Sequence, residues 1–448
     1  MKPITLKEVA SACGGELHGD PDIQITSIVT DSRQAKSGSM FAAIKGARSD
    51  GHRFIPMTAD MGAVCALCED APDIDIAYIK VPSTLVALKG IAEYYRSLFN
   101  IPFIGITGSV GKTSTKEFIA SVLSQKFKVH KTSGNFNNEL GVPITLFGLE
   151  EYHEAAVIEM GISGFGEMTR LAKMVRPDIS VITNIGYCHL ENLGDRDGVL
   201  KAKTEMFTYL SDNGAIILCH DDDKLSTITE YKGIKPVFYG TGMDDEFRAE
   251  NIVENGFDGT DCTLIHRDTR IDVTIPTMGR HNVLNALCAM AVGTRLGLSA
   301  DEIKRGIESF KNVGSRNNII KTGRYTIIDD CYNANPTSTK ASLDTLSKLS
   351  GRRVAILGDM KELGKNELSL HNETGAYAKD KGIDCLIAVG ELSKETARGY
   401  GDGAYHFDTV EECISAVKDL LHSGDTVLVK ASHSMHFEKI TEAIGSLS

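Results

Sequence analysis

The sequence of 448 residues lacks any apolar run of the roughly 20 residues that a membrane-spanning helix needs. Its opening residues, Met1-Lys2-Pro3, lead into a mixed polar pattern, whereas a signal peptide would have an apolar core there. Internal repeats and low-complexity tracts are also missing. With 42% hydrophobic and 24% charged residues, the composition is typical of a globular protein in water. We therefore expect a cytoplasmic protein with no membrane span.

Positive charge is in deficit, because the formal net charge is −12. Partners of DNA and RNA neutralise the phosphate backbone with lysine and arginine, so this balance argues against nucleic acid as the main partner. A small molecule that carries phosphate is compatible with it. Backbone N–H groups and a few local cations are enough to hold such a ligand.

One CxxC pair, Cys65 and Cys68, has no second pair to complete it. A structural zinc site usually takes four ligands. Both cysteines lie in the apolar run 63–68, so we expect them to pack in a buried strand. No Ser-His-Asp or Cys-His pattern indicates a nucleophile on the protein.

The chain is too long for a single core, and its pattern changes twice. A helical pattern over 85–98 is broken by Asn100-Ile101-Pro102, because proline disfavours helix at the residue before it. A second change falls near Gly314. We therefore predict three domains, over residues 1–99, 100–314 and 315–448.

Short apolar runs that alternate with helical stretches predict an α/β fold with mostly parallel sheets covered on both faces. A β-rich stretch at 247–275 precedes an alanine-rich helix at about 282–296. The last domain is predicted to be a smaller, Rossmann-like unit. The predicted strands are 103–106, 155–158, 179–182 and 215–218 in the second domain, and 325–328, 354–357, 385–389 and 426–429 in the third.

A glycine-rich segment follows the first of these strands and reads Gly-Ile-Thr-Gly-Ser-Val-Gly-Lys-Thr from Gly105 to Thr113. Glycines let the backbone turn its N–H groups toward phosphate oxygens. Lys112 supplies a positive charge, and Thr113 supplies a hydroxyl for Mg²⁺. The strict pattern GxxxxGK[ST] is not met, because its first glycine would fall at Ile106. The alternative is a glycine-rich turn without function, but a strand before it and a helix from Thr113 favour an ATP-binding loop.

The segment 199–210 has a helical pattern in which Lys203 falls among apolar residues. Lys201 points almost the opposite way. A lysine on a buried face must be paired or chemically altered, because a lone buried ammonium is unfavourable. The alternative is a lysine that extends along the helix surface to water. The pattern alone leaves both interpretations open.

Two further polar residues follow predicted strands, Glu159 after 155–158 and His189 after 179–182. Ligands collect at the carboxyl ends of parallel strands, and a carboxylate and an imidazole there can bind a metal. Taken singly, Glu159 could be a helix cap and His189 a structural loop residue. Beside a nucleotide loop, the metal interpretation is favoured.

Together, the phosphate loop, Glu159-Met160-Gly161, His189 and the segment 202–207 resemble the Mur ligase superfamily, whose members form amide bonds with ATP in peptidoglycan synthesis. The resemblance covers essentially the whole chain. It implies a small α/β domain for a uridine nucleotide, a central phosphate-loop domain and a C-terminal Rossmann-like domain that completes the site. Three segments, 134–143, 330–336 and 358–364, resemble the branch that joins D-alanyl-D-alanine to UDP-N-acetylmuramoyl-tripeptide.

The resemblance also implies roles for individual residues. The metal ligands would be Thr113, Glu159, His189 and Lys203, with Lys203 carbamylated by CO₂. The catalytic set would be Lys112, Glu159, His189, Lys203, Arg316 and Asp330. ATP would contact Thr107, Gly108, Ser109, Val110, Gly111, Lys112, Thr113, Ser114, Asn282, Asn285, Arg316 and Asn333. The uridine-nucleotide substrate would contact Ser32, Arg33, Lys45, Gly46, His52, Asn135 and Asn138. By pattern alone, Asn282 could be only a helix cap, and Arg316 or Asp330 a solvated surface residue.

The implied reaction begins when ATP, with Mg²⁺, phosphorylates the terminal carboxylate of the tripeptide. The amine of D-alanyl-D-alanine then attacks the acyl phosphate and completes the pentapeptide precursor. The rival interpretations are a sister ligase, a folylpolyglutamate-type ligase, or a nucleotide-binding module without catalysis. We further expect a monomer.

One segment departs from the family pattern. Lys430-Ala431-Ser432-His433 stands where the family usually has Lys-Gly-Ser-Arg, in the domain expected to receive the dipeptide. The fine specificity for the dipeptide is therefore open, as is the third residue of the tripeptide, lysine or diaminopimelate.

Overall fold

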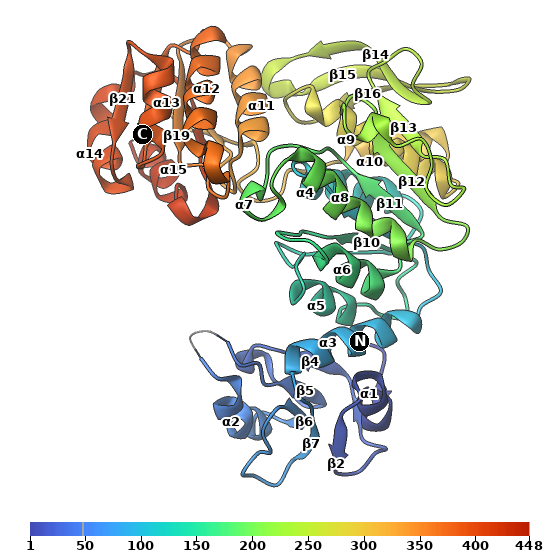
Figure 1. Cartoon of the computed structure of the whole chain (residues 1–448). Helices are drawn as coiled ribbons and strands as arrows, with labels where there is room; N and C mark the ends of the chain where they lie inside the picture. Colours follow the sequence, from blue (N-terminus) through green and yellow to red (C-terminus); the bar gives the residue numbers. More distant parts are fainter. Residues whose placement is uncertain (47–48, 448) are drawn as a thin grey trace.

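The computed structural model describes residues 1–46 and 49–447. Within them, three large sheets follow one another along the chain, each with helices packed against it (Figure 1). The helices of this described part are all too short or too polar to cross a membrane. The mixed α/β architecture with mainly parallel sheets is therefore as predicted.

The N-terminal sheet has the strand order β2-β7-β6-β5-β4 and is parallel apart from the β2–β7 pair. Cys65 and Cys68 lie buried in β6, as predicted, and burial raises the pKa of the Cys68 thiol to about 11. The elements of this part are β1 (Ile4–Thr5), α1 (Leu6–Cys13), β2 (Glu16–His18), β3 (Gln24–Ile25), β4 (Ser27–Val29), β5 (Ser39–Ala42), α2 (Ile55–Asp60), β6 (Ala63–Cys68), β7 (Ala77–Lys80) and α3 (Thr84–Ser97).

The central sheet has nine described strands in the order β16-β15-β14-β13-β12-β11-β8-β10-β9. Its strands from β9 to β14 pair in parallel, and β15 and β16 extend it in antiparallel fashion. The elements are β8 (Phe103–Thr107), α4 (Lys112–Leu123), β9 (Val129–Lys131), α5 (Gly141–Phe147), β10 (Ala155–Glu159), α6 (Glu167–Val175), β11 (Ile179–Ile182), α7 (Leu190–Leu193), α8 (Arg196–Thr204), β12 (Ala215–Cys219), β13 (Val237–Gly240), β14 (Phe247–Glu254), β15 (Thr260–His266), β16 (Thr269–Ile275), α9 (His281–Arg295) and α10 (Ala300–Glu308).

The C-terminal sheet has the order β17-β18-β22-β19-β20-β21, and only its β17–β18 pair is antiparallel among the described strands. The elements are β17 (Asn318–Lys321), β18 (Thr326–Asp329), α11 (Pro336–Ser347), β19 (Arg353–Gly358), α12 (Glu367–Asp380), β20 (Cys385–Val389), α13 (Ser393–Tyr400), β21 (Ala404–Phe407), α14 (Val410–Leu420), β22 (Thr426–Lys430) and α15 (Glu438–Gly445).

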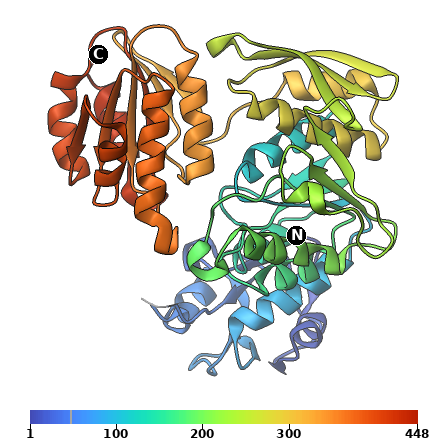
Figure 2. The same cartoon turned by 45° about the horizontal axis from the view of Figure 1, so that its top comes forward.

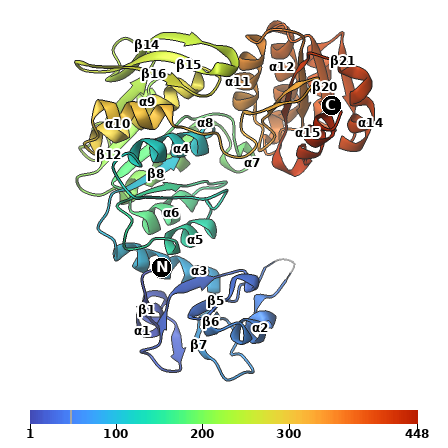
Figure 3. The same ribbon diagram turned by 180° about the vertical axis from the view of Figure 1, so that it is seen from behind.

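Helix α3 joins the N-terminal part to the central part (Figure 3). One buried apolar cluster runs through both parts and includes Tyr95 of this helix. The Tyr95 hydroxyl donates to the carbonyl of Leu149 at 2.7 Å, and Arg96 Nε donates to that of Val175 at 2.7 Å. The C-terminal part has separate apolar clusters on the two faces of its sheet. It lies to one side of the central sheet, against the β14–β15 hairpin and α7 (Figure 2).

Three local predictions differ from the structure. The helix predicted over 199–210 ends at Thr204, and a 3-10 helix, η3 (Glu205–Tyr209), follows it. Gly105 lies inside β8 and is therefore not part of the phosphate loop. A Cβ atom at Gly105 would come within 2.7 Å of Met160 Cε, so close packing under the strand explains this glycine. The helix predicted from Thr113 begins one residue earlier, at Lys112.

Candidate active site

The loop between β8 and α4, with the first residue of α4, contains three residues that suit phosphate binding, Gly108, Gly111 and Lys112. Gly108 and Gly111 have φ angles of 152° and 82°, which non-glycine residues rarely adopt. The next residue, Lys112, begins α4 and puts the free N–H groups of a helix start beside the loop. Its amine donates to the Gly108 carbonyl at 2.9 Å, and burial lowers its pKa. The loop is thus preformed around a cation.

Glu159, at the carboxyl end of β10, is almost fully buried beside this loop. The Thr113 hydroxyl donates to its Oε2 at 2.9 Å, and Asn137 Nδ2 donates to its Oε1 at 2.9 Å. The Lys116 amine lies 3.7 Å from Oε2 and donates to the Thr132 carbonyl at 2.7 Å. A hydroxyl and a carboxylate oxygen are hard donors of the kind Mg²⁺ prefers. No cluster of three His, Cys, Asp or Glu side chains that could hold a metal occurs among the described residues.

Lys203 is 1% exposed, as the predicted buried face requires. Within the described part of the chain, its amine has no hydrogen bond or ion pair. Burial lowers its pKa to about 8, and the neighbouring Lys112 amine acts in the same direction. A larger share of this amine is therefore neutral near pH 7 than in an ordinary lysine.

His189 follows β11 and has a left-handed backbone with a φ of 51°. Its Nδ1 atom lies 2.6 Å from Oε2 of Glu362, in the C-terminal part. The contact becomes an ion pair when the imidazole is protonated. The same contact lowers the pKa of the Glu362 carboxyl. His189 therefore marks a meeting point of the central and C-terminal parts.

A buried ion pair lies on the C-terminal side of the site, where the Lys430 amine donates to Asp330 Oδ2 at 2.5 Å. The same oxygen accepts from the Ser342 hydroxyl at 2.7 Å. Arg316 lies over the ring of Tyr332, with its guanidinium carbon 3.9 Å from the ring centroid. Arg316 and Lys430 thus supply two cations to the side of the site that faces the phosphate loop.

The segment that departs from the family pattern also packs here. The Ala431 side chain is tolerated because its neighbour Gly358 has no Cβ; a Cβ there would lie 2.6 Å from that of Ala431. His433 places its ring 5.7 Å from that of Tyr332, centroid to centroid. The replacements therefore keep this segment against the site.

A cavity of about 550 Å³ connects these features. It is bounded by the phosphate loop and Glu159 on one side and by the start of the C-terminal part on the other. The predicted site residues that line it are Ser109, Val110, Gly111, Lys112, Thr113, Ser114, Asn138, Glu159, His189, Asn285, Arg316, Asp330 and Asn333. Its size suits a ligand of the dimensions of a nucleotide.

Comparison with known proteins shows which family this chain belongs to. Three family models match successive stretches of the chain: the Mur ligase family catalytic domain at 24–106, the Mur ligase middle domain at 106–293 and the Mur ligase glutamate ligase domain at 315–433. The chain belongs to the Mur ligase family.

Relatives of this Mur ligase match it from end to end. It is 35% identical to UDP-N-acetylmuramoyl-tripeptide--D-alanyl-D-alanine ligase of Bacillus subtilis, over 98% of this chain and 97% of that protein. A crystal structure of MurF from Acinetobacter baumannii superposes with a TM-score of 0.94 at 32% identity, over 100% of this chain and 99% of that one. MurF from Thermotoga maritima, solved in complex with ADP, gives 0.84 at 27% identity, over 94% and 97%.

The predicted adenine residues of the Mur ligase lie together on α9. Asn285 Nδ2 donates to Asn282 Oδ1 at 2.9 Å, and Asn285 Oδ1 accepts from the Thr115 hydroxyl at 2.8 Å. Asn282 Nδ2 donates to the Met278 carbonyl at 2.7 Å, and Asn282 does not line the cavity. Asn285 does line it, so only one of the two side chains faces the space where a nucleotide would lie.

The other predicted residues that do not line the cavity fall into two groups. Thr107, Gly108 and Lys203 lie behind it, next to residues that do. Five of the seven predicted uridine-nucleotide residues lie on the N-terminal part, and three of them pair locally: Arg33 with Asp31, Lys45 with Asp70 and His52 with Asp50. Ser32, Gly46 and Asn135 make no contact with the cavity either. Asn138, which does line the cavity, accepts the N–H of Gly141, the first residue of α5, at 2.8 Å. The roles of all these residues remain predictions.

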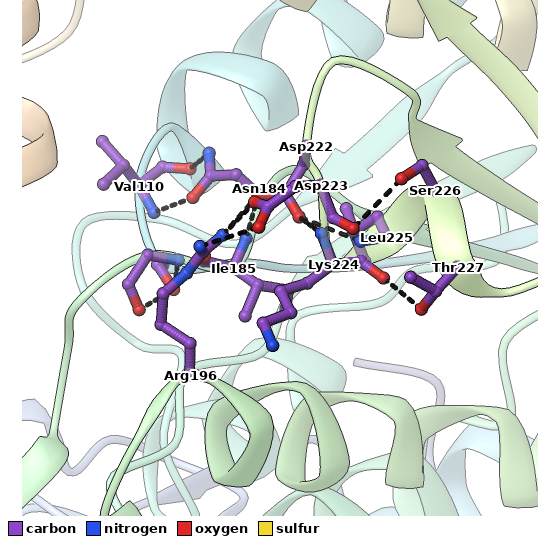
Figure 4. Close-up of polar contacts among 12 residues, drawn as sticks. Val110, Asn184, Ile185, Arg196, Asp222, Asp223, Lys224, Leu225, Ser226 and Thr227 are labelled. Atoms are coloured by element: carbon purple, nitrogen blue, oxygen red, sulfur yellow. Dashed lines mark hydrogen bonds and ion pairs between the residues drawn. The ribbon is translucent and has the colours of Figure 1, made fainter.

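Four residues near the loop were missed by the sequence reasoning: Asn137, Lys116, Asn184 and Asp222. Asn137 stands between Asn135 and Asn138, and nothing in the spacing distinguishes the three. Lys116 stands one helical turn after Lys112, which is a signal that could have indicated a second lysine on the same face of α4. Asn184 and Asp222 carry no motif. They are found only from their contacts, which Figure 4 shows.

Proposed function

We propose that this Mur ligase joins D-alanyl-D-alanine to UDP-N-acetylmuramoyl-tripeptide with ATP, through an acyl phosphate. The observation that carries the proposal is the cavity. It places a phosphate loop with Lys112 and Thr113 opposite Arg316 and the Asp330–Lys430 pair. The match from end to end with relatives named for this reaction supports the choice of substrates.

In the first step, an oxygen of the terminal carboxylate of the tripeptide attacks the γ-phosphorus of ATP. The bond from that phosphorus to the β,γ-bridging oxygen breaks, and ADP leaves. Lys112 lies where it can meet the β- and γ-phosphates, and Arg316 offers a cation from the C-terminal part. Most of the catalysis in phosphoryl transfer comes from such positioning and charge neutralisation.

In the second step, the amine of D-alanyl-D-alanine attacks the acyl carbon. Phosphate leaves, and the nitrogen loses a proton as the amide forms. The acyl phosphate must be protected from water until the amine arrives. A site between two parts of the chain can provide this protection by closing, because Arg316 and Asp330 belong to one part and the phosphate loop to the other.

The residues that would hold Mg²⁺ are Thr113, Glu159, His189 and Lys203, and when bound it would neutralise phosphate charge. We propose that Lys203 is carbamylated, with the neutral amine adding to CO₂ and losing a proton. The buried and unpartnered amine, with its pKa of about 8, supports this proposal. The product is an anion, which suits a buried position beside a cation better than an ammonium does.

We also propose three domains with the boundaries given above, a cytoplasmic location and a monomer.

A donor and acceptor screen by phosphate release tests the function. We expect release only when ATP, UDP-N-acetylmuramoyl-tripeptide and D-alanyl-D-alanine are all present, and mass spectrometry should show the pentapeptide product. Comparing tripeptides that end in lysine and in diaminopimelate would settle the donor. Release with single amino acids in place of the dipeptide would indicate a sister ligase. Slow ATP turnover without any response to muropeptides would indicate a nucleotide-binding module.

Two variants test the residue roles. Lys112→Ala should lose nearly all phosphate release, and normal turnover would contradict the loop assignment. Incubation with ¹³C-labelled CO₂ should give a carbamate signal in the NMR spectrum of the wild type that Lys203→Ala lacks. Inactive Lys203→Ala should regain activity with a small carboxylate such as formate. A fully active Lys203→Ala variant, or an inactive one that no carboxylate rescues, would overturn the carbamate proposal.

A further inference from the structure

The side chain of Asn184 binds both backbone groups of one residue in the phosphate loop. Its Oδ1 accepts the Val110 N–H at 2.9 Å, and its Nδ2 donates to the Val110 carbonyl at 2.9 Å (Figure 4). The backbone carbonyl of Asn184 also accepts the N–H of Ser109, at 3.0 Å. Two of the loop's N–H groups are thus bound inside the protein and point away from any phosphate.

Neighbours of Asn184 hold the same half of the loop. The Thr183 hydroxyl donates to the Val110 carbonyl at 2.6 Å, and the Gly186 N–H donates to the Ser109 hydroxyl at 2.8 Å. Gly108 is pressed against this segment, since a Cβ there would lie 1.9 Å from Thr183 Oγ1. The loop is therefore divided: residues 108–110 are fixed to the segment 183–186, and residues 111–113 are left for a phosphate.

Asn184 is itself held in place through the next peptide group. The Ile185 N–H donates to Asp222 Oδ2 at 2.8 Å, and the Ile185 carbonyl accepts from Arg196 Nε at 2.8 Å. Asp222 Oδ1 accepts two further N–H groups, those of Lys224 and Leu225 (Figure 4). Arg196 is the first residue of α8, the helix that carries Lys203. The segment 183–186 therefore joins the phosphate loop to that helix.

We propose that Asn184 is a positioning residue for ATP: it fixes Ser109 and Val110 so that the N–H groups of residues 111–113 face the phosphates. Asp222 and Arg196 hold Asn184 in turn. The inference rests on the proposed function in that it takes ATP as the ligand of the loop. A structural contact alone would stabilise the fold, whereas a positioning residue must change nucleotide affinity more than it changes stability or the affinity for the other substrates.

The test is calorimetric binding of ADP to the full chain, together with KM values for all three substrates. Asn184→Ala removes two hydrogen bonds to the loop, so we expect the ADP Kd and the ATP KM to rise about tenfold or more. Asn184→Asp keeps the shape and the Oδ1 acceptor but loses the donor and adds a negative charge, and should weaken ADP binding as well. The KM values for the tripeptide and the dipeptide should stay within about twofold of wild type, as should ADP binding by the control Asp212→Asn. Asp212 is an exposed residue before β12, outside the hydrogen bonds that hold Asn184.

The Asp222→Asn variant tests the support of Asn184. Its effect should be in the same direction as that of Asn184→Ala, and the double variant should be no worse than Asn184→Ala alone, because both act through one segment.

Wild-type ADP affinity in folded Asn184→Ala or Asn184→Asp would overturn the proposal. So would an equal rise in all three KM values, which would indicate a general loss of structure. If Asn184→Ala does not fold, the near-isosteric Asn184→Asp decides. Failure of the wild type to use D-alanyl-D-alanine would overturn the proposed function and leave the ADP comparison intact.

Discussion

Two lysines near the phosphate loop are equally buried but differ in how their charge is met. Lys116 and Lys203 are each 1% exposed. The Lys116 amine donates to the Thr132 carbonyl and lies 3.2 Å from Glu117 and 3.7 Å from Glu159. Within the described residues, the Lys203 amine has no such partner. An ammonium buried alone destabilises the fold, so the unmodified Lys203 is retained at the expense of stability.

Replacement of these lysines by methionine should therefore have opposite effects on stability. In CO₂-free buffer at pH 7, Lys203→Met should raise the free energy of unfolding by up to roughly 3 kcal/mol, because one pKa unit corresponds to about 1.4 kcal/mol. Lys116→Met should lower it by about 3–5 kcal/mol, because it leaves the buried Glu159 carboxylate without the ammonium beside it. Urea denaturation would measure both. The control is Lys201→Met, whose lysine is exposed, and a stabilisation as large there as at Lys203 would contradict the argument.

The effect of Lys203 on the free energy of unfolding should also depend on pH, and the direction can be stated. Its pKa is lowered from 10.5 to about 8 in the folded state. Below about pH 8, Lys203 is protonated in both the folded and the unfolded protein, so its buried charge destabilises the fold to the full extent. Between about 8 and 10.5 the unfolded chain binds more protons, so wild-type stability rises with pH relative to Lys203→Met. The stability difference should thus be constant below pH 8 and shrink above it. A difference that grows above pH 8 would show that the folded pKa is not depressed.

At the scale of single elements, Glu205 explains why the helix of Lys203 ends where it does. The carboxylate accepts the Gly166 N–H at 3.0 and 3.1 Å and the Thr169 N–H at 3.1 Å. These N–H groups belong to the start of α6, which has no side-chain cap from its own N-cap residue, Gly166. A carboxylate at a helix start is favourable, since it meets free N–H groups and the positive end of the helix dipole. The chain turns into a 3-10 helix at the residue that makes this contact.

Removal of this contact should loosen α6 without affecting nucleotide binding. We expect Glu205→Ala to lower the free energy of unfolding by about 1–2 kcal/mol, as loss of a helix cap does. Glu205→Gln, which keeps a carbonyl acceptor, should lose less. Glu191→Ala is a suitable control, because Glu191 is exposed and lies on the neighbouring α7. The comparison requires thermal or urea denaturation together with ADP binding. Equal stability of the Ala variant and the wild type would show that the contact does not stabilise α6.

Elements of the fold differ in how well the sequence predicts them. The strands β8, β10, β11 and β12 were predicted within one residue at each end, because a strand buried on both faces is a continuous apolar run. The edge strand β9 was missed, since Val129-His130-Lys131 has one apolar residue. The edge strands β17 and β21 were missed for the same reason: half-exposed strands carry polar residues. The end of α8 could not be predicted, because it depends on a contact with a helix more than 30 residues away.

The residues of the site also differ in how well the sequence predicts them. A loop whose function lies in consecutive residues was recognised from its spacing, apart from Gly105, whose role is packing. Glu159 and His189 were predicted from their positions after strands, and both line the cavity. Asn184 could not be predicted, since its partner Val110 stands 74 residues earlier. Its role depends on β8 and β11 being neighbours in the sheet, and the sequence contains no local sign of that order.

At the scale of the whole molecule, the C-terminal part meets the central part around the cavity through ion pairs and through apolar contacts that include the buried Met278. Glu254, at the end of β14, forms an ion pair with Lys348, just after α11. Phe257, in the same hairpin, lies 5.5 Å from the Lys321 amine, measured to the ring centroid. The His189–Glu362 ion pair lies on the other side of the cavity. Exposed ion pairs contribute only about 0–1 kcal/mol each, so these two pairs add little to the stability of this orientation.

Breaking both ion pairs should therefore free the C-terminal part without unfolding it. In the double variant Lys348→Ala/Glu362→Gln, small-angle X-ray scattering without ligands should give a larger radius of gyration than in the wild type, because the ion pair on each side of the cavity is lost. A non-hydrolysable ATP analogue with both other substrates should bring the two proteins back to the same value, since ligands that bridge the cavity supply new contacts. The matched control is Lys439→Ala/Glu411→Gln, which breaks an exposed ion pair within the C-terminal part and should leave the radius unchanged. If the free double variant scatters like the wild type, the apolar contacts at Phe257 and not the ion pairs fix the orientation. Phe257→Ala should then give the larger radius on its own.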